Sequence, residues 1–381
     1  MNTAPVSAGV TDEAALSRPS WALLASTMVA ALGGCLFGFD TAVISGANDA
    51  LEAAFGLGSI GLGFTVASAL IGTVVGSATA AMPADSLGRR KALIGLAVLY
   101  FASALGCALA QDWYTLVVAR TLGGLAVGGT SVVSPLYIAE ISPARWRGRL
   151  VAVVQFNIVL GILLAYLSNY LIGRVDHGAS AWRWMLGVQA VPSALFFGLL
   201  FFLPESPRWL VASGRDSEAR SVQQMLGFDA GEIDRQVGEI RAALDLEHHN
   251  LSEPLFSQAY VKPLGLAVTI ALFNQLSGIN AVMYYAPSIF RMSGAGDSSA
   301  RLQAVAVGVM NLVFTMIAMT AIDRLGRRKL MIAGSIGYIL SLSATAWAFY
   351  RWAGLPAPRA TSSSWRGCSS SSRRTRSARA R

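Results

Sequence analysis

Long apolar runs, nine in all, constrain the fold of this chain more than any other feature. Each is about 20 residues long, and a helix of that length, rising about 1.5 Å per residue, crosses about 30 Å of hydrocarbon. With 54% hydrophobic and 13% charged residues, the chain has more apolar surface than a soluble core of 381 residues can bury. The sequence therefore predicts an all-α membrane protein whose spans lie near residues 21–46, 60–82, 92–110, 114–137, 150–172, 182–203, 261–290, 302–322 and 330–350.

A short basic turn occurs twice and indicates an internal duplication. Residues 85–91 read DSLGRRK and residues 323–329 read DRLGRRK, and each copy lies between two apolar runs. Such repeats arise when a membrane protein is built from two copies of a helical half, which is common among transporters. The pattern therefore favours a transporter.

The distribution of basic residues predicts the orientation of the spans. If the N-terminus is cytoplasmic, both repeated turns and the polar segment 204–257 lie inside, together with most of the Lys and Arg residues. The outer loops then carry only Arg174, Arg183, Arg291 and Arg301. This asymmetry follows the positive-inside rule. The first twenty residues lack the pattern of a cleavable signal peptide, so we expect the first span to be retained.

The order of the runs divides the chain into five parts. We expect a cytoplasmic N-terminal segment (1–20), a six-helix bundle (21–203), a cytoplasmic helical segment (204–257), a partial second bundle of three spans (258–352) and a basic tail (353–381). In the cytoplasmic segment, Ser206 is a suitable helix cap and Pro207 suits the first helical position. The alternative for this segment is a solvated connector without a function.

The tail explains most of the positive charge. Its seven arginines supply most of the formal net charge of +9, so the basic balance does not indicate a nucleic-acid partner. The change of composition from Pro356 onward favours a shifted reading frame or a truncated gene, and the alternative is a natural disordered tail.

The adjacent His248 and His249 face different ways on a helix, and the three cysteines lack the spacing of metal ligands. We therefore expect no metal and no cofactor.

Two ionisable residues, Asp40 and Arg120, lie inside apolar runs, where a charge is costly unless it is paired or faces water. Their positions along two antiparallel spans place both roughly 8 Å to the outer side of the midplane, which makes an ion pair possible. A carboxylate holds its proton weakly while paired with a cation and strongly once the pair opens. The two residues therefore suit proton coupling, and the alternative is a static pair that fastens two helices.

Uncharged amides form a second set of polar residues in the apolar runs. They are Gln155, Asn274, Gln275, Asn280 and Asn311. Amides offer both donors and acceptors, which suits a neutral ligand with several hydroxyl groups. Gly278 lets the seventh span unwind, and Tyr285 can close its outer end. For any single amide, a hydrogen bond between helices is an equally good interpretation.

Seven stretches follow one another in an order that is typical of a known family. They are GCLFGFDTAVISG from Gly34, DSLGRR from Asp85, RTLGG from Arg120, YIAE from Tyr137 with Arg147-Gly148, PESPRWL from Pro204, QLSGINAVMYYAP from Gln275 and DRLGRR from Asp323. In these stretches the chain resembles the sugar porter family of the major facilitator superfamily. The resemblance implies the major facilitator fold, in which two six-helix bundles rock around a central sugar site, with about nine of the usual twelve transmembrane helices present here.

The resemblance also implies roles for individual residues. In proton-linked members, the aspartate that matches Asp40 is the coupling site and the arginine that matches Arg120 is its partner. The sugar contacts of the family match Gln155, Gln275, Asn280 and Asn311. Ile162 and Asn274 stand where members often have glutamine, which leaves the sugar open. A salt-bridge network that closes the cytoplasmic side matches Asp85, Arg89, Arg90, Glu140, Arg147, Glu205, Arg208, Asp323 and Arg327.

The sequence as a whole predicts a monomeric multi-pass carrier of the cell membrane. Its partners are a small neutral sugar (hexose, pentose or polyol), a proton and the lipid bilayer. We do not expect the protein to be an enzyme, because no nucleophile, set of metal ligands or phosphate-binding loop occurs in a suitable setting. Three alternatives stay open: a passive sugar uniporter, a sugar sensor that does not transport, and an inactive fragment of a sugar porter.

Overall fold

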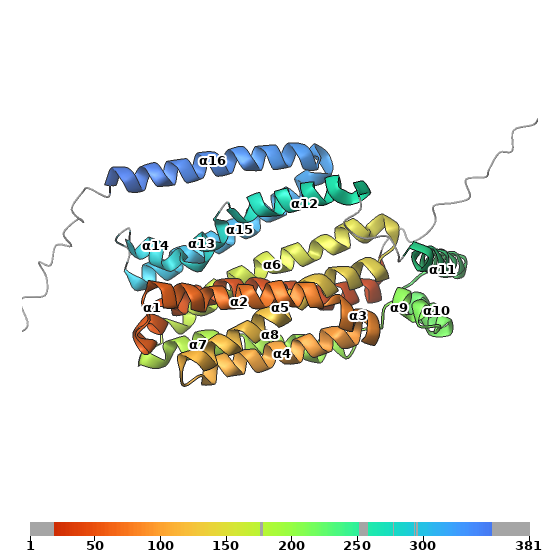
Figure 1. Cartoon of the computed structure of the whole chain (residues 1–381), viewed down its shortest axis with the longest axis horizontal. Coiled ribbons are helices and arrows are strands. Elements are labelled where there is room, and N and C mark those ends of the chain that lie inside the picture. The colour runs from red at the N-terminus through yellow and green to blue at the C-terminus, as the bar shows by residue number, and fades with distance from the viewer. Residues whose placement is uncertain are drawn as a thin grey trace, which may run out of the picture.

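The computed structural model describes residues 19–175, 178–250, 258–276, 278–292, 294 and 296–352, without the side chains of 245–250, 258–260, 274, 322–325, 327, 348, 349 and 352. Within these ranges every regular element is a helix, which confirms the predicted fold class. The long helices lie roughly side by side (Figure 1). The predicted basic tail lies outside the described residues.

The first six spans form one bundle. They are α1 (Trp21–Phe55), α2 (Ser59–Thr79), α4 (Arg89–Leu109), α5 (Trp113–Ile141), α6 (Ala144–Ile172) and, after a single 3-10 turn (Gly178–Ser180), the pair α7 (Ala181–Gly187) and α8 (Ala190–Leu200). Side chains cap two of them, because Ser20 accepts a hydrogen bond from the Leu23 amide of α1 and Asp112 accepts one from the Thr115 amide of α5.

The sixth span is interrupted, although the sequence shows it as one apolar run. Helix α7 ends at Gly187 and α8 begins at Ala190. Pro192 has no N–H to donate to the Val188 carbonyl, so one helical hydrogen bond is lost at this point. The break leaves the side chain of Gln189 buried between the two helices.

Glycines let pairs of helices in this bundle approach backbone to backbone. A Cβ atom at Gly38 of α1 would overlap the carbonyl oxygen of Ile158 on α6, and one at Gly161 of α6 would overlap that of Cys35. The contact between α2 and α5 has the same character at Gly72, Gly76, Gly124 and Gly128. Close packing of this kind holds membrane helices together without a hydrophobic driving force.

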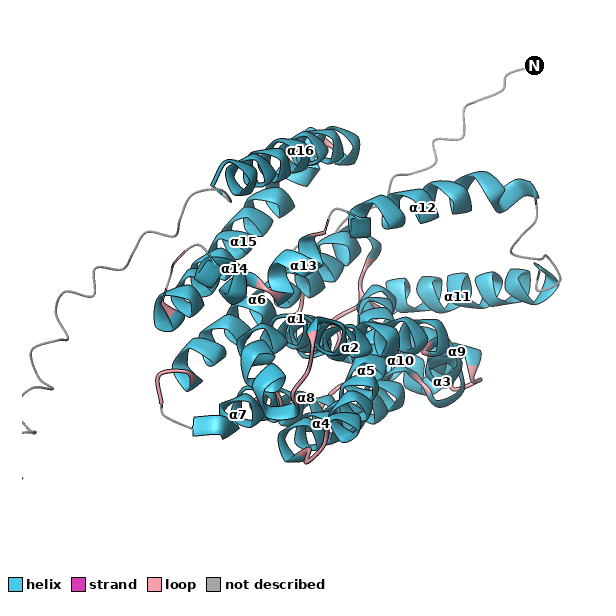
Figure 2. Ribbon diagram, turned by 60° about the vertical axis from the view of Figure 1, so that its left-hand side comes forward, coloured by secondary structure: helices cyan, strands magenta, loops and turns pink. Residues whose placement is uncertain are grey.

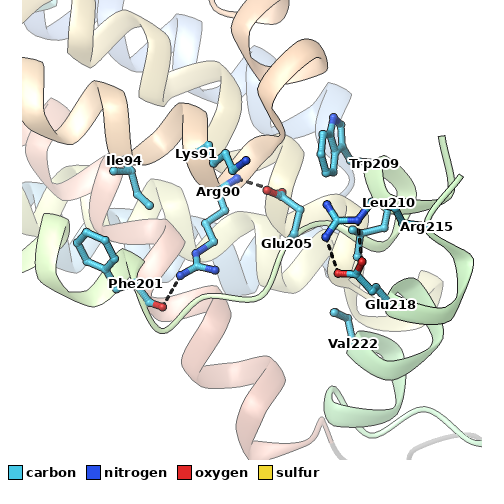
Figure 3. A pocket seen from close by; sticks show the side chains of 10 residues that line it. All are labelled: Arg90, Lys91, Ile94, Phe201, Glu205, Trp209, Leu210, Arg215, Glu218 and Val222. Atoms are coloured by element: carbon cyan, nitrogen blue, oxygen red, sulfur yellow. Dashed lines mark hydrogen bonds and ion pairs between the residues drawn. The ribbon is translucent and has the colours of Figure 1, made fainter. Parts of the chain in front are cut away.

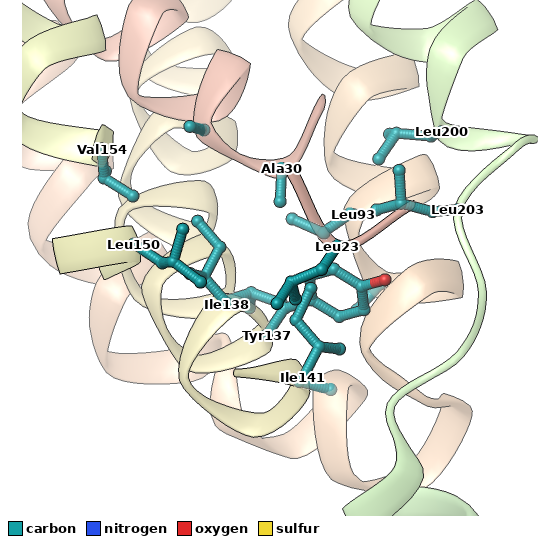
Figure 4. Packing of buried hydrophobic residues seen from close by; sticks show 14 of the residues in the cluster. Leu23, Ala30, Leu93, Tyr137, Ile138, Ile141, Leu150, Val154, Leu200 and Leu203 are labelled. Atoms are coloured by element: carbon teal, nitrogen blue, oxygen red, sulfur yellow. The ribbon is translucent and has the colours of Figure 1, made fainter. Parts of the chain in front are cut away.

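A cluster of buried apolar side chains fills one half of the bundle. Figure 4 shows Leu23 of α1, Leu93 of α4, Tyr137 of α5 and Leu150 of α6 within it. The Tyr137 hydroxyl donates to the Pro204 carbonyl oxygen at 2.9 Å, so the polar tip of this buried ring is satisfied. The cluster fixes the helices that carry the candidate site.

Short helices cover the end of the bundle that we call the inner end, after the predicted orientation. They are α3 (Ala81–Leu87), α9 (Pro207–Ala212), α10 (Asp216–Met225) and α11 (Ala230–Asn250), and Figures 1 and 2 show the last three close together. As predicted, Ser206 caps α9, with Oγ 3.3 Å from the Trp209 amide, and Pro207 is its first residue. Leu210 and Val237 are buried in the same apolar cluster as the spans, so this segment packs on the bundle.

The remaining helices form a second group. It contains α12 (Gln258–Leu276), α13 (Ile279–Tyr284), α14 (Ala286–Met292), α15 (Asp297–Leu325) and α16 (Arg327–Trp352). The predicted seventh span comprises α12 to α14 and breaks at Gly278, where φ is +76°. The sequence predicts this unwinding from the same glycine. Among the described residues, eight segments meet the length and hydropathy of a membrane span, and α12 contributes the shorter apolar stretch Val261–Phe273.

The repeated basic turn has the same backbone feature in both copies. Gly88 lies between α3 and α4 with φ of +97°, and Gly326 lies between α15 and α16 with φ of +78°. Side chains other than hydrogen are disfavoured at such angles. The duplication seen in the sequence therefore extends to a glycine with positive φ in each turn.

Candidate functional site

Asp40 of α1 and Arg120 of α5 form an ion pair inside the first bundle. Oδ1 of Asp40 lies 4.0 Å from Nη1 of Arg120, and the two side chains are 13% and 2% exposed. The sequence predicts this proximity from the matched depth of the two residues. At 4.0 Å the groups attract each other without sharing a hydrogen bond, and Nε of Arg120 is buried without a partner among the described residues. The carboxylate is thus near a cation and available to a proton.

A buried tyrosine and a buried glutamine share a hydrogen bond within the same bundle. The Tyr100 hydroxyl of α4 lies 2.8 Å from Oε1 of Gln189 and 3.3 Å from the Leu36 carbonyl oxygen. Tyr100 is within electrostatic range of both Asp40 and Arg120. Neither residue belongs to the sites predicted from the sequence. Their presence in apolar runs was the available signal, because a polar group there needs a partner.

Two of the predicted amides meet across the break in the seventh span. Nδ2 of Asn280, in α13, donates to Oε1 of Gln275, in α12, at 3.3 Å. Gly278 separates the two residues and turns the chain between them. The break thus brings a donor and an acceptor group together at the same place.

The other predicted sugar-binding residues share no described hydrogen bond with this pair. Gln155 of α6 is exposed and Asn311 of α15 is half-buried, and neither forms a hydrogen bond with a described side chain of the pair. Tyr285 is half-buried at the junction of α13 and α14. The side chain of Asn274 lies outside the described residues.

At the inner end, Arg89 joins two predicted members of the salt-bridge network. Its Nη2 lies 2.9 Å from Oε1 of Glu140 on α5, and its Nη1 lies 3.1 Å from Oδ1 of Asp85 on α3. The Glu140 side chain is 5% exposed, and its second oxygen accepts a hydrogen bond from the Ser206 hydroxyl. The carboxylate is therefore desolvated but fully paired, which makes the removal of a partner costly.

Glu205 and Arg90 form a second part of this network. Oε1 of Glu205 accepts hydrogen bonds from the backbone amides of Arg90 (3.1 Å) and Ser206 (2.9 Å). The first of these satisfies a free N–H in the first turn of α4, where negative charge is favourable. The Arg90 side chain donates to the carbonyl oxygens of Leu200 and Phe201. Together these bonds tie the start of α4 to the end of the sixth span.

A cavity of about 420 Å³ lies between α4 and the inner helices α9 and α10, as Figure 3 shows. Arg215 and Glu218 form an ion pair at its edge, with Nε of Arg215 2.7 Å from Oε1 of Glu218. The hydrogen bonds from Arg215 lower the pKa of the Glu218 carboxyl. Trp209, another lining residue, donates from Nε1 to the Asp85 carbonyl oxygen at 2.8 Å. Helix α9 is therefore hydrogen-bonded to α3.

The other predicted network residues are placed differently. Arg147 is exposed on α6 and forms no ion pair with a described residue, whereas Arg208 is half-buried in α9. The side chains of Asp323 and Arg327 lie outside the described residues. The inner network that can be described thus belongs to the first bundle and the short helices that cover it.

Comparison with known proteins gives a consistent result. The family model described as "Sugar (and other) transporter" matches residues 26–355. A D-xylose transporter from Levilactobacillus brevis is 39% identical over 82% of this chain and 68% of its own length. The D-xylose-proton symporter from Escherichia coli (strain K12) is 37% identical over 85% of this chain and 72% of its own length.

A solved structure also aligns with most of the chain. It is that of the major facilitator superfamily proton:xylose symporter XylE bound to 6-bromo-6-deoxy-D-glucose. The TM-score is 0.78 at 37% identity, with 87% of this chain and 75% of that chain covered.

Proposed function

The chain belongs to the family of sugar and other transporters, and on that premise we propose that it moves a neutral sugar together with a proton across the cell membrane. It is a multi-pass membrane protein with the major facilitator fold, and it is a transporter and not an enzyme. The proposal is that it works as a monomer in the lipid bilayer, by alternating access. The ion pair between Asp40 and Arg120 is the observation that carries the proton-coupled part of this proposal.

Asp40 is the proposed proton carrier and Arg120 its partner. While the guanidinium is engaged, the carboxylate is stabilised as an anion and releases its proton easily. A movement between α1 and α5 that lengthens the 4.0 Å separation would leave a buried carboxylate that gains a proton instead. Proton affinity thus depends on conformation, which is the property that links proton flow to a conformational cycle.

The amide set is the proposed sugar site. Gln275 and Asn280 present a donor and an acceptor at the break in the seventh span, and Gln155 and Asn311 offer further amides on α6 and α15. Asn274 and Tyr285 complete the proposed set. Amides match the hydroxyl groups of a sugar without requiring a charge on the ligand. A monosaccharide such as xylose is the first substrate to test, because two of the relatives described above are named for it.

The inner salt bridges are the proposed gate of the cytoplasmic side. The bonds of Arg89, Glu140 and Glu205 hold the turn between α3 and α4 against α5 and the segment before α9. In a carrier of two rocking bundles, such bonds would hold the inner face of the first bundle in the form that meets the second bundle in one of the two access states.

The decisive experiment separates exchange from accumulation in Asp40→Asn. The purified chain is reconstituted into vesicles, and labelled xylose is measured both in equilibrium exchange and in accumulation driven by an imposed proton gradient. We expect Asp40→Asn to retain exchange and to lose accumulation, because the amide cannot release a proton. Glu52→Gln is the matched control on the same helix, since Glu52 is exposed near the end of α1.

Three outcomes would contradict the proposal. If Asp40→Asn still accumulates sugar against its gradient, Asp40 is not the proton carrier. If the unaltered chain exchanges sugar but sugar entry does not alkalinise the medium of energy-depleted cells, the chain is a passive uniporter. Loss of a monodisperse chromatographic peak in Asp40→Asn would instead identify the pair as a static fastener of α1 and α5.

A further inference from the structure

Polar contacts at the outer end join the first bundle to the second group of helices. The Asn48 side chain of α1 donates to the Tyr284 carbonyl oxygen of α13 at 2.9 Å, and the Tyr166 hydroxyl of α6 donates to the Met283 carbonyl oxygen at 2.8 Å. All four residues are buried. The seam between α1, α6 and α13, defined by these four residues, is therefore closed to water.

Arg291 of α14 lies at the rim of this outer seam. Its guanidinium contacts the carboxylate of Asp49, the residue that follows Asn48 on α1. It also contacts Asp297 at 3.4 Å and Ser288 at 3.0 Å, which belong to its own group of helices. The Arg291 and Asp49 side chains are 25% and 55% exposed, so this ion pair is in contact with water and can break without leaving a buried charge.

The inner end of the molecule has no equivalent tie among the described side chains. The hydrogen bonds and ion pairs that join the first bundle to α13, α14 and α15 all involve outer-end residues, including the bond from Arg301 to the Gly173 carbonyl oxygen. The salt bridges of Arg89 at the inner end stay within the first bundle and α3. The structure thus has its outer side closed by contacts between the two groups.

We propose that Asp49 and Arg291 form a latch that favours closure of the outer seam. This inference rests on the proposed transport function, in which the outer side has to open once in each cycle. Opening separates Asp49 from Arg291, because they belong to different groups, whereas Asp297 moves together with Arg291. An exposed ion pair is a weak tie, so its removal should increase the open population only roughly threefold. A weak latch suits a seam that has to open repeatedly.

A cysteine behind the latch reports its opening. Ala286 of α14 is 3% exposed and lies in the apolar cluster between α1 and α14. Intact cells that express the Ala286→Cys chain are treated with a membrane-impermeant maleimide in the absence of sugar, and the labelling rate is measured per molecule of chain. The chain that retains Ala286 gives the background from the native cysteines.

We expect Asp49→Asn and Arg291→Gln each to raise the labelling rate roughly threefold. The double variant should be no faster than either single variant, because both remove the same interaction. Exchanging the charges, with Asp49→Arg and Arg291→Asp together, should bring the rate back toward that of the unaltered pair. This recovery distinguishes the latch from general damage to the fold.

Asp297→Asn is the matched control, because it removes the other carboxylate of Arg291 and keeps the tie to α1. Its labelling rate should equal that of the parent chain. The latch is overturned if Asp49→Asn leaves the rate unchanged, or if Asp297→Asn raises it equally. The assay needs neither sugar nor a proton gradient, so a chain that labels as expected but moves no sugar would refute the transport proposal alone.

Discussion

Gly38 lies just before Asp40 on α1, and its lack of a side chain lets α1 pack closely against α6. The same stretch of chain therefore carries both a helix contact and the proposed proton site. We expect Gly38→Ala to destabilise the protein by about 1–3 kcal/mol, because the added methyl group overlaps the Ile158 carbonyl and forces the two backbones apart. Unfolding by a denaturing detergent measures the change.

Gly95→Ala is the control for this prediction. Gly95 lies in α4, and a Cβ atom there has nothing within 4 Å. Alanine is the better helix former by about 1 kcal/mol, so this variant should be neutral or slightly more stable. Equal losses of stability in both variants would show that glycine flexibility, and not the contact with α6, matters at residue 38.

Single residues were predictable where their chemistry conflicts with hydrocarbon. The matched depth of Asp40 and Arg120 made an ion pair between them possible, and the structure places the two groups 4.0 Å apart. The bond between Tyr100 and Gln189 did not follow, since it depends on how α4 packs on the broken sixth span. Likewise, the sequence could name Gln155 and Asn311 but could not show whether they reach Gln275.

At the scale of elements, the repeated turn offers a test within one molecule. Gly88 and Gly326 both have positive φ, yet only Gly88 has a neighbour: a Cβ atom there would overlap Oε2 of Glu205, whereas at Gly326 nothing lies within 4 Å. We expect both alanine variants to lose about 1–3 kcal/mol through backbone strain, and Gly88, with ψ of 157°, lies in a region that essentially only glycine adopts. Gly88→Ala should lose a further 1–3 kcal/mol, roughly the value of a charge-assisted hydrogen bond, because Glu205 is displaced from the Arg90 amide.

Denaturant titrations of the two variants, with and without Glu205→Gln, check this difference. The extra loss in Gly88→Ala should shrink once Glu205 has been replaced, because the displaced bond is then already weakened. Equal losses of stability from alanine at the two glycines would contradict this prediction, because the Glu205 side chain would then move aside without a loss of stability.

The same elements show what sequence can and cannot predict about helix boundaries. The break of the seventh span followed from Gly278, since a glycine between two polar residues is a plain signal for unwinding. The break of the sixth span was missed, although Pro192 marked it, because proline is common in membrane helices and often only bends them.

At the scale of the whole molecule, the two groups of helices differ in how much of their surface is covered by protein. Of the apolar 18-residue stretch in each helix, 61% is buried in α1, whereas 11% is buried in α15 and 0% in α16. Hydropathy could not predict this contrast, because α1 and α15 have nearly the same mean hydropathy, 1.9 and 2.0. Which face of a helix meets another helix depends on small residues and shape, and not on how apolar the helix is.

This contrast predicts an order of hydrogen exchange. In detergent micelles, where water reaches the edges of the spans, amides exchange through local opening, and tertiary contacts are what oppose that opening. The amides of α16 should therefore exchange first, those of α15 next, and those of α1 and α5 last. We expect the exchange rates of α16 and α1 to differ by at least about tenfold, which corresponds to roughly 1.4 kcal/mol in the free energy of local opening. Mass spectrometry of peptides from each helix measures the rates. Helix α2, with an intermediate 33% buried, is the internal control and should lie between α15 and α1. If α16 is protected as strongly as α1, its backbone bonds are held by the micelle alone, and protein burial does not set the stability of the second group.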